Sequence, residues 1–204
     1  MIAIIDYNMG NLLSVSKALE TVSDNIKIID NPDDLKNAAG IVLPGVGNFG
    51  EGMEHLRARG FEAPLLEAIN AGIPFLGICL GMQMLMEYSE EAPGVKGLGV
   101  FKGGVIRFPD GIEKVPHMGW NNISIKQQEV AALANIAEDS YFYFVHSYYV
   151  APEDLSVVAA SCNYITEVAA AIGYKNIFAT QFHPEKSQDK GLTILKNFIN
   201  SITS

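Results

Sequence analysis

The chain has 204 residues, enough for one domain with a full hydrophobic core. Its formal net charge is −9 and its Lys and Arg residues form no cluster, so we expect neither nucleic acid nor an anionic membrane as a partner. The apolar runs are too short for a membrane span, and two distant cysteines argue against a disulfide framework and for a cytoplasmic protein.

The first half of the chain alternates strand and helix patterns. The segment Met1–Asp6 lacks the basic start of a signal peptide and is typical of a buried strand. Strands are predicted at 2–6, 26–29, 41–43 and 73–78, the third stopped by Pro44-Gly45. Helices are predicted from Leu12 to Val22, near 50–58 and 62–71, and from Met82 to Tyr88. This alternation predicts a parallel sheet covered on both faces.

The second half is richer in β-like segments. Short runs occur within 95–125, and 141–150 and 157–162 have strand composition. Residues 168–174 and 177–182 resemble a hairpin around Lys175-Asn176, and an apolar stripe predicts a closing helix from about Gln188. We therefore predict an α/β fold over 1–204: a single doubly wound, mostly parallel sheet flanked by helices, with an added antiparallel β portion in the second half.

A cysteine lies where the fourth strand is expected to end, in Gly77-Ile78-Cys79-Leu80-Gly81. Small residues two positions before and after a nucleophile, between a strand and a helix, are typical of a nucleophile elbow. The sharp turn crowds the backbone, so we expect only glycine to fit on either side. We also expect the N–H groups at the start of the following helix to favour a thiolate. The alternative is a small packing cysteine.

A second motif, Gln181-Phe182-His183-Pro184-Glu185, separates the last predicted strand from the last helix. A cysteine nucleophile needs a base, and the base needs an acceptor that orients it. In an extended chain His183 and Glu185 point to the same side, and Pro184 favours extended geometry at His183. The two motifs together predict a catalytic triad of Cys79, His183 and Glu185. The alternative for Glu185 is a surface carboxylate at a helix start.

The paired motifs resemble the triad class of glutamine amidotransferases. Within it, the chain resembles the glutaminase subunits of imidazole glycerol phosphate synthase, in order and over nearly its whole length. Two segments distinguish these subunits from relatives that serve other acceptors: Pro44-Gly45-Val46-Gly47 and Gly119-Trp120-Asn121. Those relatives usually carry Pro-Gly-Gly in the first of these segments. Asn8 replaces an expected glycine, a neutral departure because Asn tolerates left-handed φ. The other matching segments are Asp6-Tyr7, Gly10-Asn11-Leu12, 77–83, Pro116-His117-Met118, 146–149 and 182–187.

The resemblance implies one glutamine amidotransferase type 1 domain that hydrolyses glutamine. The ammonia would pass to a (β/α)8-barrel cyclase subunit, in a heterodimer that forms imidazole glycerol phosphate in histidine biosynthesis. The phosphorylated substrate would bind the partner, in agreement with the acidic charge and the lack of a phosphate-binding Gly-Lys loop here. We expect no cofactor and no metal, because the four histidines lack zinc-ligand spacing.

An oxyanion intermediate needs two backbone N–H donors. Elbow geometry assigns one to Leu80, and the loop around Val46 and Gly47 is expected to supply the other. The plainer interpretation of that loop is an ordinary turn after a strand.

Four residues are expected to bind glutamine by resemblance. Gln83, one helical turn after Cys79, would bond the amino-acid end, and Glu91 would pair with the ammonium. Ser147 and Tyr148 would contact substrate through their backbone. Without these roles, Gln83 would be an exposed helix residue and Glu91 a solvated carboxylate.

Trp120 is the single tryptophan, and its place in a Gly-rich stretch suggests an interface anchor instead of a core residue. Tyr143 and Lys186 are assigned to the same interface, because each lies close in sequence to the expected catalytic face.

Three other functions compete. The first is a glutaminase subunit for another acceptor, such as that of pyridoxal phosphate synthase, which would lack Gly-Trp-Asn. The second is a non-hydrolytic cysteine sensor on the same fold, which an intact His183 and Glu185 pair argues against. The third is a cysteine peptidase. A glutaminase assay with and without the barrel cyclase distinguishes the first two alternatives from a glutaminase subunit of imidazole glycerol phosphate synthase.

Overall fold

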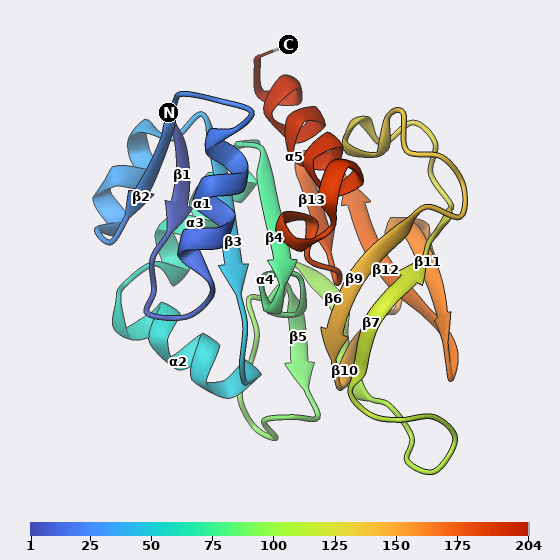
Figure 1. The fold of residues 1–204 in the computed structure, drawn as a ribbon. Coiled ribbons are helices and arrows are strands. Elements are labelled where there is room, and N and C mark those ends of the chain that lie inside the picture. The colour runs from blue at the N-terminus through green and yellow to red at the C-terminus, as the bar shows by residue number, and fades with distance from the viewer. Residues whose placement is uncertain (204) are drawn as a thin grey trace.

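The computed structural model describes residues 1–203, which form a central sheet with helices on both faces and two smaller sheets (Figure 1). The central sheet has eight strands in the order β2-β1-β3-β4-β13-β12-β11-β8. Its bounds, in that order, are Ile26–Ile29, Ile2–Ile5, Gly40–Gly45, Phe75–Cys79, Ile177–Thr180, Thr166–Tyr174, Val158–Tyr164 and Ser124–Ile125. The strands from β2 to β13 are parallel, and β13 to β8 are antiparallel. The predicted fold class is confirmed.

Two separate apolar clusters pack on the two faces of this sheet. One cluster joins β3 and β4 to α2 and α3 through residues such as Leu43, Phe49 and Leu65. The other joins the opposite sides of the same strands to α1 and α5 through residues such as Val42, Leu19 and Phe198. The helices are α1 Leu12–Glu20, α2 Phe49–Ala58, α3 Glu62–Asn70, α4 Leu80–Gln83 and α5 Gln188–Thr203, with 3-10 turns η1 Pro32–Asn37, η2 Ala131–Leu133, η3 Leu155–Val157 and η4 Pro184–Lys186.

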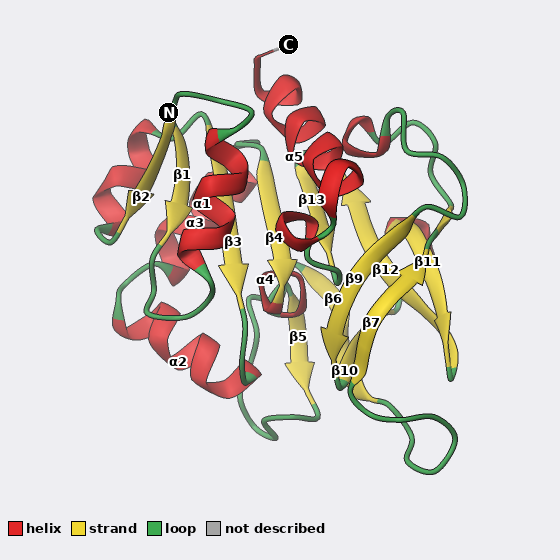
Figure 2. Ribbon diagram, viewed as in Figure 1, coloured by secondary structure: helices red, strands yellow, loops and turns green. Residues whose placement is uncertain are grey.

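The strand-rich stretch 141–150 is divided between two sheets. β9 (Tyr141–His146) pairs with β7 (His117–Asn122) in a two-stranded ribbon. β10 (Tyr148–Pro152) pairs with β6 (Phe101–Arg107), and β6 pairs on its other side with β5 (Met86–Ser89), so these three strands form the second small sheet. Figure 2 shows the ribbon standing beside the antiparallel half of the central sheet. Ser147, between β9 and β10, is therefore the point where the chain changes sheets.

The predicted helix from Met82 to Tyr88 is wrong. The helix α4 ends at Gln83, and β5 begins at Met86. A short apolar run fits a buried helix or a buried strand equally well, so its contacts with other segments determine which of the two forms. Here the carbonyl of Leu85 accepts the N–H groups of Val100 and Phe101, which holds the segment extended.

The prediction that Pro44-Gly45 stops the third strand is also wrong, because β3 runs through both residues. Ile41 donates its N–H to Pro74, on the β4 side. By strand alternation the nitrogen of Pro44 faces β1, whose pairing with β3 ends at Val42. The missing N–H of Pro44 therefore breaks no ladder bond.

None of the helices in residues 1–203 is long and apolar enough to cross a membrane.

The end of β4 is the most crowded part of the central sheet. A Cβ on Gly81 would lie 2.0 Å from the carbonyl oxygen of Leu43, and one on Gly77 would lie 2.9 Å from that of Gly81. The expectation that only glycine fits on either side of Cys79 is confirmed.

We expect Gly81→Ala to lower the free energy of unfolding by about 3 kcal/mol, because its Cβ would meet a backbone atom of a packed strand. Gly94→Ala is the control: no atom lies within 4 Å of its added Cβ, and only its φ of 88° is unfavourable. That strain costs about 1 kcal/mol. Urea denaturation measures both, and equal losses would contradict the crowding argument.

Candidate active site

Cys79 lies at the junction of β4 and α4 with φ 53° and ψ −103°, a left-handed conformation that non-glycine residues rarely adopt. Its side chain is almost fully buried. Such strain is typical of functional sites. The helix that follows has four residues, so the expected support for a thiolate from aligned helix dipoles is smaller than predicted.

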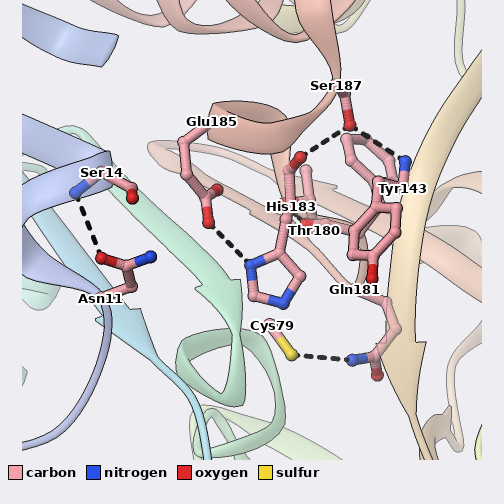
Figure 3. A network of polar contacts seen from close by, with 10 residues as sticks. Asn11, Ser14, Cys79, Tyr143, Thr180, Gln181, His183, Glu185 and Ser187 are labelled. Carbon is pink, nitrogen blue, oxygen red and sulfur yellow. Dashed lines mark hydrogen bonds and ion pairs between the residues drawn. The ribbon is translucent and has the colours of Figure 1, made fainter. Parts of the chain in front are cut away.

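His183 and Glu185 form a buried pair. The distance between His183 Nδ1 and Glu185 Oε1 is 2.8 Å, and both side chains are 1% exposed. His183 is extended, as predicted, but Glu185 lies in the 3-10 turn η4, so the contact forms across a turn and not along a strand. Figure 3 shows Cys79 near the imidazole edge opposite Glu185.

The backbone of His183 is held by strand β9. Its N–H donates to the carbonyl of Tyr143 at 2.9 Å. Ser187 Oγ donates to the carbonyl of His183 at 2.6 Å and accepts the N–H of Tyr143 at 3.0 Å. These bonds hold the backbone of His183 against the ribbon, and Figure 3 shows the two that Ser187 makes.

The charge state of His183 depends on opposing effects. Burial lowers its pKa, but the negative charge of Cys79 and then the Glu185 carboxylate outweigh burial and raise the pKa to about 10. Its Nε2 atom is buried and has no hydrogen-bond partner among residues 1–203. The arrangement therefore favours an imidazolium with one N–H free to meet a reacting group beside the sulfur.

Gln181 is a site residue that we did not assign from the sequence. Its Nε2 donates to Cys79 Sγ at 3.6 Å, and its Oε1 accepts from Gln83 Nε2 at 3.1 Å. The same Gln83 atom donates to the carbonyl of Tyr148 at 3.0 Å. The available signal was its spacing, since a residue two before His183 at a strand end lies on the same side.

A cavity of about 290 Å³ opens over the sulfur. Its size suits a small ligand, at the low end of small-molecule pockets. Glu185 lies behind His183 and does not line it. The predicted residues that line it are Val46, Gly47, Cys79, Leu80, Gln83, Glu91, Ser147, Tyr148 and His183, joined by Pro116, Val145 and His146.

Glu91 is more constrained than a solvated carboxylate. Its Oε2 accepts the N–H of Phe49, the first residue of α2, at 2.7 Å. Burial is the main effect on its carboxyl and raises its pKa. The residue thus connects the cavity wall to the helix that follows the Val46 loop.

That loop begins at a fixed point. Tyr7 Oη, fully buried, donates to the carbonyl of Pro44 at 2.9 Å, and Gly45 pairs with Cys79. Two residues later Gly47 has φ 105°, which glycine adopts without strain. The loop therefore leaves β3 beside the sulfur.

Trp120, Tyr143 and Lys186 lie outside the cavity but next to one another. Trp120 and Tyr143 face each other across β7 and β9, with ring centroids 6.2 Å apart and nearly perpendicular planes. Lys186 Nζ lies 5.9 Å from the centroid of the Tyr143 ring. Met118 and Tyr141, on the same ribbon, are also exposed. We refer to Met118, Trp120, Tyr141, Tyr143 and Lys186 as the ribbon face.

No group of three or more His, Cys, Asp or Glu side chains in residues 1–203 could hold a metal ion. A larger cavity of about 670 Å³, between η2, α5 and the β12–β13 hairpin, contains none of the predicted site residues.

Known sequences match this protein along nearly the whole chain. The family model described as glutamine amidotransferase class-I matches residues 3–202. The imidazole glycerol phosphate synthase subunit HisH 1 of Methanococcus maripaludis is 49% identical, over 99% of this chain and 100% of its own. The subunit HisH of Geobacter sulfurreducens is 52% identical, over 97% of both chains.

Solved structures share the fold at low sequence identity. A crystal structure of a glutamine amidotransferase superposes with a TM-score of 0.77 at 16% identity and covers both chains completely. A structure of PurLQS from Thermotoga maritima gives a TM-score of 0.77 at 18% identity, over 98% of this chain and 97% of that one.

The raised pKa of His183 can be tested by NMR titration of its imidazole. We expect the pKa to fall from about 10 toward its ordinary value of 6.5 in Cys79→Ala, and by less in Glu185→Gln, because Cys79 is the larger favourable effect. A pKa raised by folding adds stability that is complete below 6.5 and lost as the pH rises through about 10. An unchanged pKa of His183 in Cys79→Ala would contradict the assignment of the raised pKa to Cys79.

Proposed function

Because the chain belongs to the class-I glutamine amidotransferase family, we propose that it hydrolyses glutamine to glutamate and ammonia as the glutaminase subunit of imidazole glycerol phosphate synthase. The observation that carries this proposal is identity of about half over the full length of relatives with that name. We propose further that residues 1–204 act as one glutamine amidotransferase type 1 domain in the cytoplasm, without a cofactor.

The proposed reaction starts at the sulfur. Cys79 attacks the side-chain carboxamide carbon of glutamine, and the carbonyl oxygen becomes an oxyanion. His183, oriented by Glu185, gives its Nε2 proton to the leaving ammonia, and the oxyanion collapses to a thioester. His183 then takes a proton from water, which attacks the thioester and releases glutamate and the thiolate. The buried 2.8 Å contact of Glu185 supports its role as the orienting group.

The oxyanion would accept two backbone N–H groups. We assign these to Leu80, which directly follows the nucleophile, and to Val46 or Gly47 in the loop that leaves β3. All three line the cavity together with Cys79, which supports the assignment.

We assign the amino-acid end of glutamine to the far side of the cavity. Glu91, one of whose oxygens is already bonded to Phe49, would pair its other oxygen with the ammonium. Gln83 and the backbone of Ser147 and Tyr148 would complete the contacts. Gln83 already donates to the Tyr148 carbonyl, so these groups would bind as one unit.

Ammonia would be used by a (β/α)8-barrel cyclase subunit, which also holds the phosphorylated substrate. We propose that this partner docks on the ribbon face, in a heterodimer. The exposed Trp120 and Met118 supply apolar contact there, and Lys186 supplies charge. Tyr143 connects this face to catalysis, because its backbone binds His183 and Ser187.

We also propose that docking switches the enzyme on. Val46 lies between two glycines, so the loop can rotate a peptide plane at low steric cost and exchange a carbonyl for an N–H at the oxyanion. One such donor is worth about 10²–10³ in turnover. The partner shifts this equilibrium only by its different affinity for the two loop states.

Cys79→Ala should abolish glutamine-dependent imidazole glycerol phosphate formation by the complex. Supplied ammonium salts should still support cyclisation, because that chemistry belongs to the partner. Cys162→Ala is the matched control: Cys162 is buried outside the cavity, and burial raises its pKa to about 12. Turnover of glutamine by Cys79→Ala would refute the nucleophile.

Glutaminase turnover should be low for the free chain, higher with the partner and highest with partner plus its nucleotide substrate, by about 10²–10³ in total if one oxyanion donor is gained. Gly47→Ala should reduce this stimulation while docking persists, because φ 105° disfavours a side chain and its Cβ would lie 3.1 Å from Met9 Cε. Gly111→Ala, at an exposed turn with no atom within 4 Å, is the control. Equal turnover in all three states would refute the switch.

A further inference from the structure

Two buried histidines of the ribbon have no place in the triad. His117 and His146 face each other across β7 and β9, with 3.0 Å between His117 Nδ1 and His146 Nε2. They are 3% and 5% exposed. The imidazole of His117 is stacked between the rings of Phe144 and Tyr164, with centroids at 4.8 and 4.0 Å.

The partners of the pair fix the direction of every hydrogen bond. A carbonyl only accepts, so His146 donates its Nδ1–H to Tyr148 at 2.8 Å, and in a neutral ring its Nε2 is then an acceptor. At the other end, Asn121 Oδ1 accepts the N–H of Asn122, so Asn121 Nδ2 donates to His117 Nε2 at 3.3 Å. Both ends therefore require His117 Nδ1 to donate to His146, with both imidazoles neutral.

Electrostatics agree with this assignment. Burial lowers the pKa of His117 to about 4 and that of His146 to about 3. Two cations at 3.0 Å would repel, and neither could accept the hydrogen bond that the other offers.

The chain of hydrogen bonds continues to the nucleophile. The Tyr148 carbonyl that accepts from His146 also accepts from Gln83. Gln83 donates to Gln181 Oε1 as well, which leaves Gln181 Nε2 directed at Cys79 Sγ. An unbroken series of bonds thus runs from Asn121, beside Trp120 on β7, to the catalytic sulfur.

We propose that His117 and His146 are positioning residues for glutamine hydrolysis, which fix the Tyr148 carbonyl and, through it, the amides of Gln83 and Gln181 against Cys79. This inference rests on the proposed function and assigns two residues to it. Each group in the series has one orientation that satisfies the hydrogen bonds of its neighbours. A shift of β7 therefore moves the Gln181 amide that donates to Cys79 Sγ. The series therefore couples the ribbon face to the nucleophile independently of the Tyr143 bonds to His183.

The test compares variants of His117 in the complex with the barrel cyclase. His117→Phe keeps the stack on Phe144 and Tyr164 but removes both hydrogen bonds. We expect kcat for glutamine to fall about 10- to 100-fold, with a smaller change in KM, because a misplaced reacting group costs turnover. His117→Asn should recover part of the loss, because its Nδ2 can replace the Nδ1 donor toward His146.

Alkylation of Cys79 by iodoacetamide, followed by mass spectrometry of the free chain, gives a second measurement that a purely structural role would not change. The rate near pH 7 should fall in His117→Phe and recover in His117→Asn, because the Gln181 amide that holds the sulfur in place is displaced in the first variant and partly restored in the second. The control is Tyr164→Phe, which keeps the stack and loses a hydroxyl bond to Lys114 outside the series. It should match the parent in both measurements.

Three results would overturn the positioning role: parental kcat and alkylation in folded His117→Phe, an equal loss in Tyr164→Phe, or an equal loss of ammonium-supported cyclisation, which would place the defect in docking. Should His117→Phe not fold, Asn121→Ala replaces it at the half-buried end of the series, with the same two measurements and the same criteria. Glutamine turnover by the parent complex tests the proposed function, whereas variant-to-parent alkylation ratios test this inference alone.

Discussion

The left-handed backbone of Cys79 is the constraint around which the site is arranged. The sharp turn at Cys79 brings the backbones of β3, β4 and α4 into contact, which only the absence of side chains at Gly77 and Gly81 allows. The neighbours of β4 are β3 on one side and β13 on the other. Since the carboxyl ends of these parallel strands meet at one edge of the sheet, β3 delivers the Val46 loop and β13 delivers the histidine motif to the same sulfur.

The ribbon of β7 and β9 adds a second layer to this arrangement. Along each strand, side chains alternate between the buried histidines and aromatic rings on one side and the ribbon face on the other. Tyr143 shows the result: its ring is partly exposed beside Trp120, while its backbone binds His183 and Ser187. The surface proposed for docking and the groups that bind the backbone of His183 therefore belong to one short strand.

The sequence predicts the parallel half and the elbow because both depend on local patterns. Alternating apolar segments, and two glycines around Cys79, carry that information within a few residues. The predicted helix over Met82–Tyr88 is wrong because the extended state of this segment depends on hydrogen bonds from residues about 15 positions later. For the same reason, neither the contact of Gln181 with Cys79 nor that of His117 with His146 is predicted, since the two residues of each contact lie 102 and 29 positions apart. The catalytic roles themselves remain predictions.

The position of Trp120 has a spectroscopic consequence. The chain contains one tryptophan, and 47% of its surface is exposed on the ribbon, in edge contact with Tyr143. Selectively excited indole emission from the folded protein therefore comes from this face alone, with no background from the core. The wavelength and polarisation of that emission follow the hydration and mobility of one strand, so the chain carries its own optical label on the ribbon that binds the backbone of His183.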